Sequence, residues 1–307
     1  MNRFTPQAAV PLEAVRVENE SGLMQDLMTL TKARLSLLVI VTTFVGFCMA
    51  TRGPVEWLPL LSATLGTALA AAAAAVLNQY MESHVDRLME RTRHRPLPGG
   101  RMKPATALGL GIALAIAGVA WLWFTANAMS AYLAAATIAI YLFFYTPLKR
   151  KTSLCTIVGA VSGAIPPVIG WTAARPSLDA GALILFGVLF TWQMPHFLAI
   201  AWMYRDEYAQ AGFVMLQRDD VSGCATAMQS LLFTLGLTAV TLAPYFVGMN
   251  NAIYFAGALG LDAVMLFFAV RFLLLRNRPS ARALFFTSIF YLPVILGLMV
   301  FTKVQGL

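Results

Sequence analysis

One short stretch of the chain carries an amide and two carboxylates at a spacing that suits metal binding. Asn78, Glu82 and Asp86 follow one another at intervals of four residues. On a helix each such interval turns the side chain by only about 40°, so all three lie on one face. Mg²⁺ prefers oxygen ligands and commonly takes substrate phosphate oxygens as well. We therefore expect Asn78, Glu82 and Asp86 to hold Mg²⁺ beside a phosphorylated substrate and to act in catalysis.

Basic side chains crowd the segment that follows Asp86, where they would offset the charge of a diphosphate. Guanidinium groups bind phosphate oxygens through paired hydrogen bonds, and a metal ion eases departure of a diphosphate by drawing off its charge. The alternative is a loop that only marks one side of a membrane, with its acids paired to arginines. We expect four of these residues to contact the substrate: Arg87, Arg91, Arg95 and Lys103.

A histidine stands deep in a later apolar stretch. His196 precedes the end of that stretch at Met203 by about 10 Å of helix rise. An ionisable side chain at such depth in a membrane is a functional candidate, because a neutral imidazole can bind a metal, orient a substrate or act as a base. The alternative is a structural histidine held by a hydrogen bond. If the helix continues, His196, Met203 and Glu207 share a face that connects the imidazole to the polar segment beyond.

That polar segment is a second acidic cluster. Asp206 and Glu207 are candidates for catalysis and for a second Mg²⁺ site. Another apolar stretch ends in three basic residues, Lys149, Arg150 and Lys151, which either bind the same diphosphate or merely mark one side of the membrane. The remaining substrate-binding candidates are Lys149, Arg150, Trp192, Tyr204, Arg205 and Tyr208.

The elements that position these residues must be membrane helices. Of 307 residues, 59% are hydrophobic and 12% are charged, against roughly a quarter charged in a typical soluble domain. A membrane-spanning helix needs about 20 apolar residues. We predict an all-α, polytopic membrane bundle, with residues 1–32 as a cytoplasmic tail and 33–303 as one intramembrane domain. Its nine predicted helices are 33–51, 57–82, 104–124, 127–147, 153–173, 179–203, 226–248, 252–272 and 283–303.

The basic residues predict the orientation of these helices. With nine spans, 19 of the 22 Lys and Arg residues lie on the side of the N-terminus, while Arg52, Arg175 and Lys303 lie on the other side. Such an excess marks the cytoplasmic side, so we expect both acidic clusters and the active site to face the cytoplasm. The basic residues sit at helix ends rather than in a separate basic domain, which argues against nucleic-acid binding.

Five segments resemble one known family. The series from Asn78 to Asp86 is similar to the first aspartate-rich motif of the UbiA-type intramembrane prenyltransferases. Four more segments resemble the haem-directed branch of that superfamily, the protohaem IX farnesyltransferases or haem O synthases. They are ERTRHRPLPGGRM (90–102), YTPLKRKT (145–152), WQMPHF (192–197) and YRDEYAQAGFVML (204–216).

The resemblance implies a nine-helix bundle whose central cavity faces the cytoplasm of a bacterial inner membrane. It implies that farnesyl diphosphate and Mg²⁺ bind between the two acidic motifs. The farnesyl group would pass to a vinyl group of haem B, with addition of water, to give haem O. His196 would ligate or orient the porphyrin, and a haem A synthase or a second copy of the chain would be a partner. Two departures from the superfamily pattern are Glu82 in place of aspartate and tyrosines at 204 and 208.

Three other functions are compatible with parts of this pattern. A sister enzyme would prenylate the aromatic ring of a quinone precursor, but WQMPHF argues for the haem-directed branch. A secondary transporter would carry charges near the membrane midplane, whereas these acids lie near helix ends. A structural subunit of an oxidase would leave two acidic motifs with adjacent arginines unexplained.

Overall fold

The computed structural model describes residues 22–210, 212–214, 216 and 220–304, whose regular structure is helical. Eight helical stretches within them are long and apolar enough to cross a membrane. The predicted class, an all-α multi-pass membrane bundle, is confirmed. The eight are Trp57–Asp86 (α3), Pro104–Thr125 (α4), Ala128–Leu148 (α5, η1 and α6), Cys155–Ala174 (α7 and α8), Ala180–Met203 (α9), Cys224–Phe246 (α11), Ala252–Leu275 (α12) and Arg278–Phe301 (α13).

A further long helix, α2, occupies the place of the first predicted span. It covers Ala33–Ala50, of which Ser36–Ala50 is the apolar part. Together with the eight longer spans of the described residues, α2 agrees with a bundle of about nine membrane helices. Two spans are composite: Ala128–Ala139 (α5), Ile140–Tyr145 (η1) and Thr146–Leu148 (α6) form one, and Cys155–Ala164 (α7) and Pro166–Ala174 (α8) form the other.

Side-chain caps mark where several helices begin. The Asn127 side-chain oxygen accepts a hydrogen bond from the Ser130 N–H at 2.9 Å, at the start of α5. Asp179 and Asn251 cap α9 and α12 in the same way, and Asn277 forms a capping box on α13. Such caps satisfy backbone donors that the first turn of a helix leaves unpaired. The Asn127 cap also separates the third and fourth predicted spans, which only a few uncharged residues divide.

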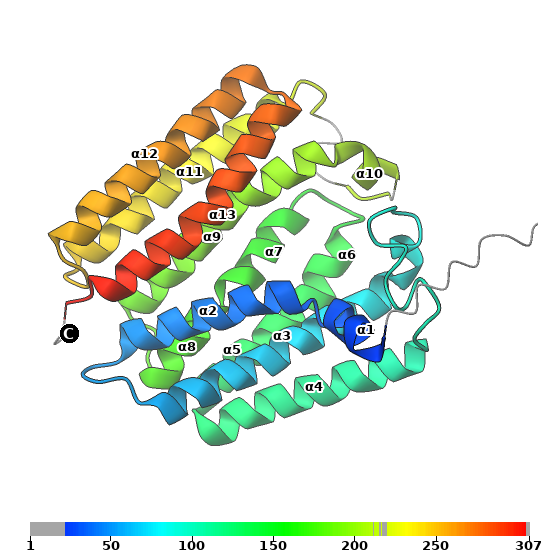
Figure 1. Ribbon diagram of the computed structural model, residues 1–307, viewed down its shortest axis with the longest axis horizontal. Helices are drawn as coiled ribbons and strands as arrows, with labels where there is room; N and C mark the ends of the chain where they lie inside the picture. The colour runs from blue at the N-terminus through cyan, green and yellow to red at the C-terminus, as the bar shows by residue number, and fades with distance from the viewer. Residues whose placement is uncertain (1–21, 211, 215, 217–219, 305–307) are drawn as a thin grey trace, which may run out of the picture.

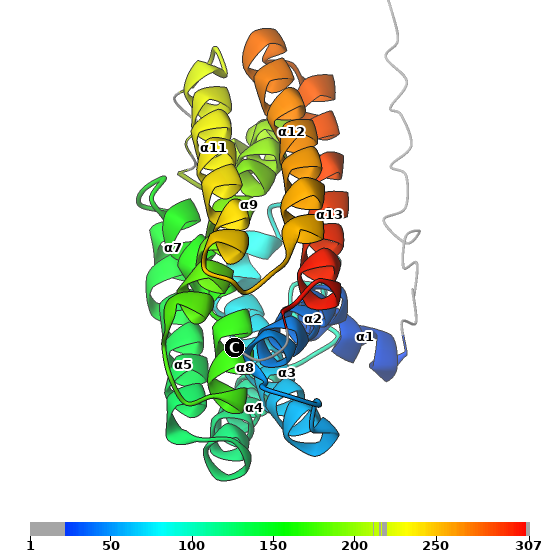
Figure 2. The same cartoon turned by 90° about the vertical axis from the view of Figure 1, so that its left-hand side faces the viewer.

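The helices form two packed groups, seen side by side in Figures 1 and 2. In one group, α9 contacts α11 and α13, and α12 contacts α11 and α13. In the other, α3 packs along α4, and α2 along α8. Small residues let α3 approach its neighbours closely, since Ala70, Ala73 and Ala74 are buried against α4 and α5. Figure 1 places α1, α6 and α10 at one end of the bundle and the C-terminus of α13 at the other.

The chain before α2 contacts the bundle through α1, Leu23–Leu30, which the sequence prediction assigned to the N-terminal tail. Leu30 is fully buried, and Asp26 pairs with Arg101 at 2.8 Å. This hydrogen bond is the main cause that raises the pKa of Arg101. Lys32 then adopts left-handed backbone (φ 50°) and turns the chain into α2. The turn brings the Lys32 ammonium group to α3.

Candidate active site

The C-terminal part of α3 carries a buried polar face. Asn78 is 1% exposed, Asp86 4% and Glu82 8%. The helix continues to Asp86, so side chains four residues apart stay on one face, and the Asn78 amide donates to Glu82 Oε2 at 2.9 Å. The three residues predicted to hold Mg²⁺ therefore lie together.

Both carboxylates of this face contact a cation. Lys149 Nζ donates to the two Glu82 oxygens at 2.9 and 3.0 Å, and the Arg95 guanidinium pairs with Asp86 at 2.7 Å. Lys149 follows α6, and Arg95 lies in the loop after α3, so the cations reach the face from different segments. None of the four side chains is more than 20% exposed, and breaking an ion pair so shielded from water is costly. The site therefore holds positive charge directly against both carboxylates.

Further contacts to Asn78 come from residues that the sequence analysis missed. Lys32 Nζ donates to Asn78 Oδ1 at 3.0 Å and to the Tyr141 hydroxyl at 3.4 Å. The Asn78 amide also donates to Thr146 Oγ1 at 3.0 Å. There was a reason in the sequence to consider Thr146, which lies in the segment YTPLKRKT. There was no reason to consider Lys32, whose contact with Asn78 spans 46 residues of sequence.

A π-helix forms part of the wall beside α3. η1 joins α5 to α6, and single π turns within helices are frequent at functional sites. The Tyr141 and Tyr145 ring centroids are 5.1 Å apart, and Lys149 Nζ lies 4.5 Å from the centroid of the Tyr145 ring. Gly159 makes room for Tyr145, because a Cβ atom there would lie 2.8 Å from that ring. η1 therefore places two tyrosines beside Lys149 and, through it, beside Glu82.

Lys149 keeps its charge in this setting. Burial is the largest single influence and disfavours the ammonium form, but Tyr145, Glu82 and Tyr141 together outweigh it and raise the pKa of Lys149. The backbone of Lys149 is anchored as well, since the Val214 N–H donates to its carbonyl oxygen at 2.7 Å. A protonated and well-positioned lysine is thus available next to the predicted metal ligands.

The second acidic cluster is separated from His196 by the end of a helix. α9 ends at Met203, Tyr204 leaves helical geometry (φ −113°, ψ 23°), and α10 covers Arg205–Gln210. The predicted continuous face from His196 to Glu207 is therefore wrong, because the backbone at Tyr204 interrupts the helical repeat. The histidine and the acids belong to two differently placed elements.

The two acids of α10 have different surroundings. The Asp206 side chain is 88% exposed and lies 3.7 Å from Arg205 at the surface. Glu207 Oε2 is buried and has no hydrogen-bond partner within the described residues. A buried carboxylate oxygen without a partner is costly unless a ligand or metal contacts it. Of the two acids, Glu207 therefore has the surroundings that suit a ligand contact.

An aromatic contact connects α10 to the first motif. The ring centroids of Tyr208 and Phe213 lie 6.0 Å apart, and Phe213 packs with the buried side chains of Val85 and Met89. Lys149 Nζ lies 5.7 Å from the Phe213 ring centroid. The structure thus brings Tyr208, a predicted substrate-binding residue, next to the end of α3.

The other predicted phosphate contacts lie at the surface. Within the described part of the chain, Arg95 and Lys149 are the members of the predicted set that contact Glu82 or Asp86. The exposed members still contribute to a positive field that attracts anions. They are Arg87, Arg91, Lys103 and Arg150.

His196 lies in an aromatic cluster between α9 and α13. Its Nδ1 is 2.8 Å from Ser288 Oγ, and the Trp192 indole N–H donates to the Ser288 carbonyl oxygen at 2.8 Å. The imidazole centroid lies 5.1 Å from the Trp192 ring and 4.9 Å from Phe285. No hydrogen bond among the described residues engages Nε2. A hydroxyl on one nitrogen fixes the ring orientation and leaves the other nitrogen for a ligand.

These features define a class: a multi-pass membrane enzyme whose buried amide and carboxylates, surrounded by cations, suit a phosphorylated substrate. The sequence model of the UbiA prenyltransferase family matches residues 39–292, and the chain belongs to this family. The predicted family resemblance is therefore confirmed, and so is the prediction that the chain is a prenyltransferase.

The similar sequences carry a more specific name. A "Protoheme IX farnesyltransferase" of Solibacter usitatus is 42% identical over 289 residues, which cover 91% of this chain and 99% of that protein. A "Protoheme IX farnesyltransferase, mitochondrial" of Homo sapiens is 39% identical over 277 residues, which cover 90% of this chain and 62% of that protein. Relatives with this name therefore align with most of the chain.

Solved structures share the fold at low sequence identity. One, described as a study of digeranylgeranylglyceryl phosphate synthase, superposes with a TM-score of 0.77 at 14% identity and covers 91% of this chain and 98% of that one. A UbiA homolog from Archaeoglobus fulgidus bound to GPP and Mg²⁺ superposes with a TM-score of 0.63 at 12% identity, with 89% and 99% covered. Both likenesses bear on the fold alone.

Proposed function

We propose that this chain transfers the farnesyl group of farnesyl diphosphate to a vinyl group of haem B, with addition of water, to give haem O. The observation that carries the proposal is the buried Asn78, Glu82 and Asp86 face with a cation on each side chain. The names of the relatives support the acceptor and the farnesyl donor. The GPP and Mg²⁺ in the Archaeoglobus fulgidus homolog support metal-assisted chemistry on a prenyl diphosphate.

The residues present fit Mg²⁺ shared with a diphosphate. Within the described residues, no group of three His, Cys, Asp or Glu side chains could hold a metal by itself. The oxygens of Asn78, Glu82 and Asp86, with phosphate oxygens and water, match the shell that Mg²⁺ prefers. The buried, unpartnered oxygen of Glu207 would be available to a second Mg²⁺ rather than to this one. Bound at Asn78, Glu82 and Asp86, Mg²⁺ would withdraw charge from the departing diphosphate.

The cations of the site would change partners when the diphosphate binds. Lys149 and Arg95 hold Glu82 and Asp86 in this structure. With the carboxylates bound to a metal ion, the same ammonium and guanidinium groups would become available to the phosphate oxygens. Lys32, which bonds Asn78 Oδ1, would do likewise. The site would thus exchange internal ion pairs for contacts to the leaving group.

The reaction balances without an oxidant or reductant. The allylic carbon–oxygen bond of farnesyl diphosphate breaks, and the diphosphate leaves with the electron pair. The vinyl π electrons form the new carbon–carbon bond, which leaves a cation beside the porphyrin ring. Water adds its oxygen to that carbon and releases a proton. Apolar surroundings of the bound farnesyl chain would keep other water from the allylic cation.

His196 is proposed to orient the haem acceptor. His196→Ala should raise KM for haem B about ten- to a hundredfold and leave KM for farnesyl diphosphate unchanged, because Nε2 is free to contact the porphyrin or its iron. Steady-state kinetics with each substrate varied measure the two KM values. The Soret band of haem B measures its binding directly. Thr191→Ala, five residues earlier in α9, is the control. An equal rise in both KM values would contradict the role.

Purified protein with haem B, farnesyl diphosphate and Mg²⁺ should yield a porphyrin heavier by one farnesyl group plus water. Chelation of Mg²⁺ should abolish the product, because the carboxylates alone would repel the diphosphate. Chromatography with mass spectrometry measures both results. No product with haem B, but a prenylated product with a quinone-precursor aromatic acid, would refute the acceptor and retain the enzyme class.

The active site is proposed to face the cytoplasm of a bacterial inner membrane. The distribution of Lys and Arg supports this orientation. Cys224, at the start of α11, is exposed, while Cys48 and Cys155 are buried. A membrane-impermeant maleimide should therefore label Cys224 in inverted vesicles and not in intact cells stripped of their outer membrane. Labelling of Cys224 in those intact cells would show that the active site faces the other side of the membrane.

A further inference from the structure

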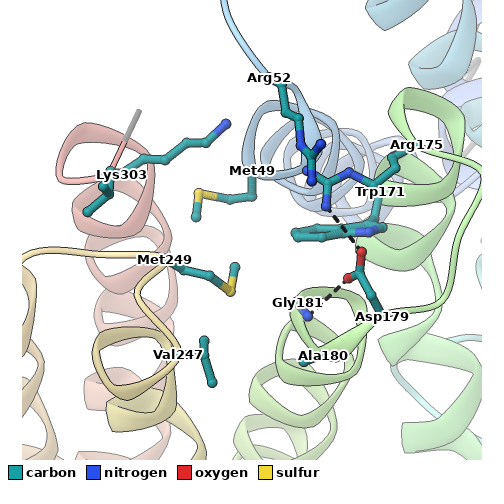
Figure 3. A pocket seen from close by; sticks show the side chains of 11 residues that line it. Met49, Arg52, Trp171, Arg175, Asp179, Ala180, Gly181, Val247, Met249 and Lys303 are labelled. Carbon is teal, nitrogen blue, oxygen red and sulfur yellow. Dashed lines mark hydrogen bonds and ion pairs between the residues drawn. The ribbon is translucent and has the colours of Figure 1, made fainter. Parts of the chain in front are cut away.

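A pocket lies at the end of the bundle away from the Asn78 face, near the C-terminus of α13 (Figures 1 and 3). Its volume is about 190 Å³, and it forms where the ends of α2, α8, α11 and α13 meet the start of α9. Its apolar lining includes Met49, Met249 and Val247. The prenyl-transfer chemistry does not use this pocket.

Three basic residues from distant parts of the sequence line the pocket. They are Arg52, Arg175 and Lys303, the same three that the sequence places on the side opposite the other 19. The orientation of the helices in the membrane requires only that basic residues be few on this side. It does not require that these residues line the same pocket. The carboxylate that lines the pocket, Asp179, accepts hydrogen bonds from the first turn of α9. Positive charge therefore exceeds negative charge around the pocket.

Two of these cations are held in place by contacts within the protein. Arg175 pairs with Asp179 at 3.2 Å and donates to the Ala50 carbonyl oxygen at 3.2 Å. Lys303 donates to two carbonyl oxygens at the end of α2, one of them that of Cys48 at 2.7 Å. An ammonium group has three donors, so Lys303 keeps one donor beyond these two carbonyl contacts. Burial lowers the pKa of Lys303, and the Arg175 charge acts in the same direction.

Two further donors at the pocket have no acceptor among the described residues. The exposed Arg52 guanidinium makes no hydrogen bond or ion pair there. The indole N–H of Trp171 is buried without a hydrogen-bond partner, and Trp171 as a whole is 3% exposed. Gly181 makes room for the indole, because a Cβ atom there would lie 2.1 Å from it. Of these two donors, the exposed Arg52 guanidinium is the one that an oxygen-rich anion in the pocket would reach.

We propose that this pocket binds the phosphate group of an anionic membrane lipid. The pocket lies where several membrane spans end, which is the depth of lipid headgroups. Phosphate oxygens accept paired hydrogen bonds from guanidinium groups, and the methionine and valine side chains suit the adjoining carbon chain. The volume is below the roughly 300–1,000 Å³ of pockets that enclose drug-sized ligands, so it suits a headgroup rather than a porphyrin.

Native mass spectrometry of the full chain with equal amounts of phosphatidylglycerol and phosphatidylcholine tests the proposal. The unmodified chain should retain phosphatidylglycerol preferentially. Arg52→Gln should bind it about tenfold more weakly, the loss expected for one charge-assisted contact, and Arg52→Glu more weakly still. Arg282→Gln removes an exposed charge at the opposite end of α13 and should bind as the unmodified chain does. Prenyl transfer by Arg52→Gln in detergent should be unchanged, which separates this site from the proposed function.

A second variant and a competitor complete the test. Val247→Phe fills the pocket without changing its charge and should also lose phosphatidylglycerol. The proposal would be overturned if Val247→Phe retained phosphatidylglycerol, or if Arg52→Gln bound phosphatidylglycerol as tightly as the unmodified chain does. Inorganic phosphate should displace the lipid weakly, because it lacks the apolar part. Displacement by phosphate at the same concentration as a short-chain phosphatidylglycerol would show a site for free anions instead and overturn the assignment to a lipid.

Discussion

Glu82→Gln and Asp86→Asn should each lower kcat/KM for farnesyl diphosphate by about a thousandfold. Each change keeps the side-chain shape and removes one negative charge proposed to hold Mg²⁺ against the diphosphate. A metal ion contributes several kcal/mol to stabilising charge in such a transition state, and each ~1.4 kcal/mol is a factor of ten in rate. Rates of product formation at varied farnesyl diphosphate, with Mg²⁺ in excess, measure the loss.

Glu90→Gln is the matched control for these variants. The Glu90 side chain is 83% exposed and pairs only across the surface with Arg93 at 3.4 Å, so its loss should leave the rate near that of the unmodified chain. Thermal unfolding of each variant shows whether it is folded. If folded Glu82→Gln and Asp86→Asn both retained full activity, the metal-site assignment would be refuted.

Lys149→Met should lower kcat/KM by a hundred- to a thousandfold, because it removes a charge proposed to stabilise the leaving diphosphate. It should also destabilise the fold by about 3–5 kcal/mol, since the buried Glu82 carboxylate would lose its cation. Kinetics and chemical unfolding in detergent measure the two effects separately. Lys151→Met, an exposed lysine two residues on, is the control and should change neither.

The double variant Glu82→Gln with Lys149→Met separates a catalytic pair from a structural one. Removing both partners leaves no buried charge alone, so the double variant should regain most of the stability that Lys149→Met loses. It should regain no activity, because both the proposed metal ligand and the diphosphate contact are gone. Recovery of activity together with stability would show that the pair serves folding alone.

The membrane class and most helix positions followed from the sequence because lipid imposes a simple rule. An apolar stretch of about 20 residues has to form a helix in order to satisfy its backbone in lipid. The predicted spans therefore agree with the structure except at their ends, where polar residues such as the cap Asp179 or the last turn of α3 extend or shorten them. The shared face of Asn78, Glu82 and Asp86 followed from helix geometry alone.

Tertiary packing decided which charged residues surround that face. Lys32 and Lys149 meet Asn78 and Glu82 across 46 and 67 residues, and nothing in their local sequence specifies those partners. Tertiary packing also decided the difference between Glu207 and Asp206, which are neighbours in sequence. Glu207 has a buried carboxylate oxygen, whereas the Asp206 side chain is exposed. Burial depends on where α10 begins after Tyr204, a backbone detail that periodicity does not encode.

The sequence by itself determined that this protein lies in a lipid membrane, where its helices run and which residue types its chemistry requires. Only the tertiary structure decided that Arg95 and Lys149, rather than the exposed Arg87 and Arg91, contact the carboxylates. It also decided that the three cations on the opposite side converge on one pocket. The physical reason is that hydropathy and helical period act along the chain, whereas a binding site is formed by side chains from separate helices whose packing sets their distances.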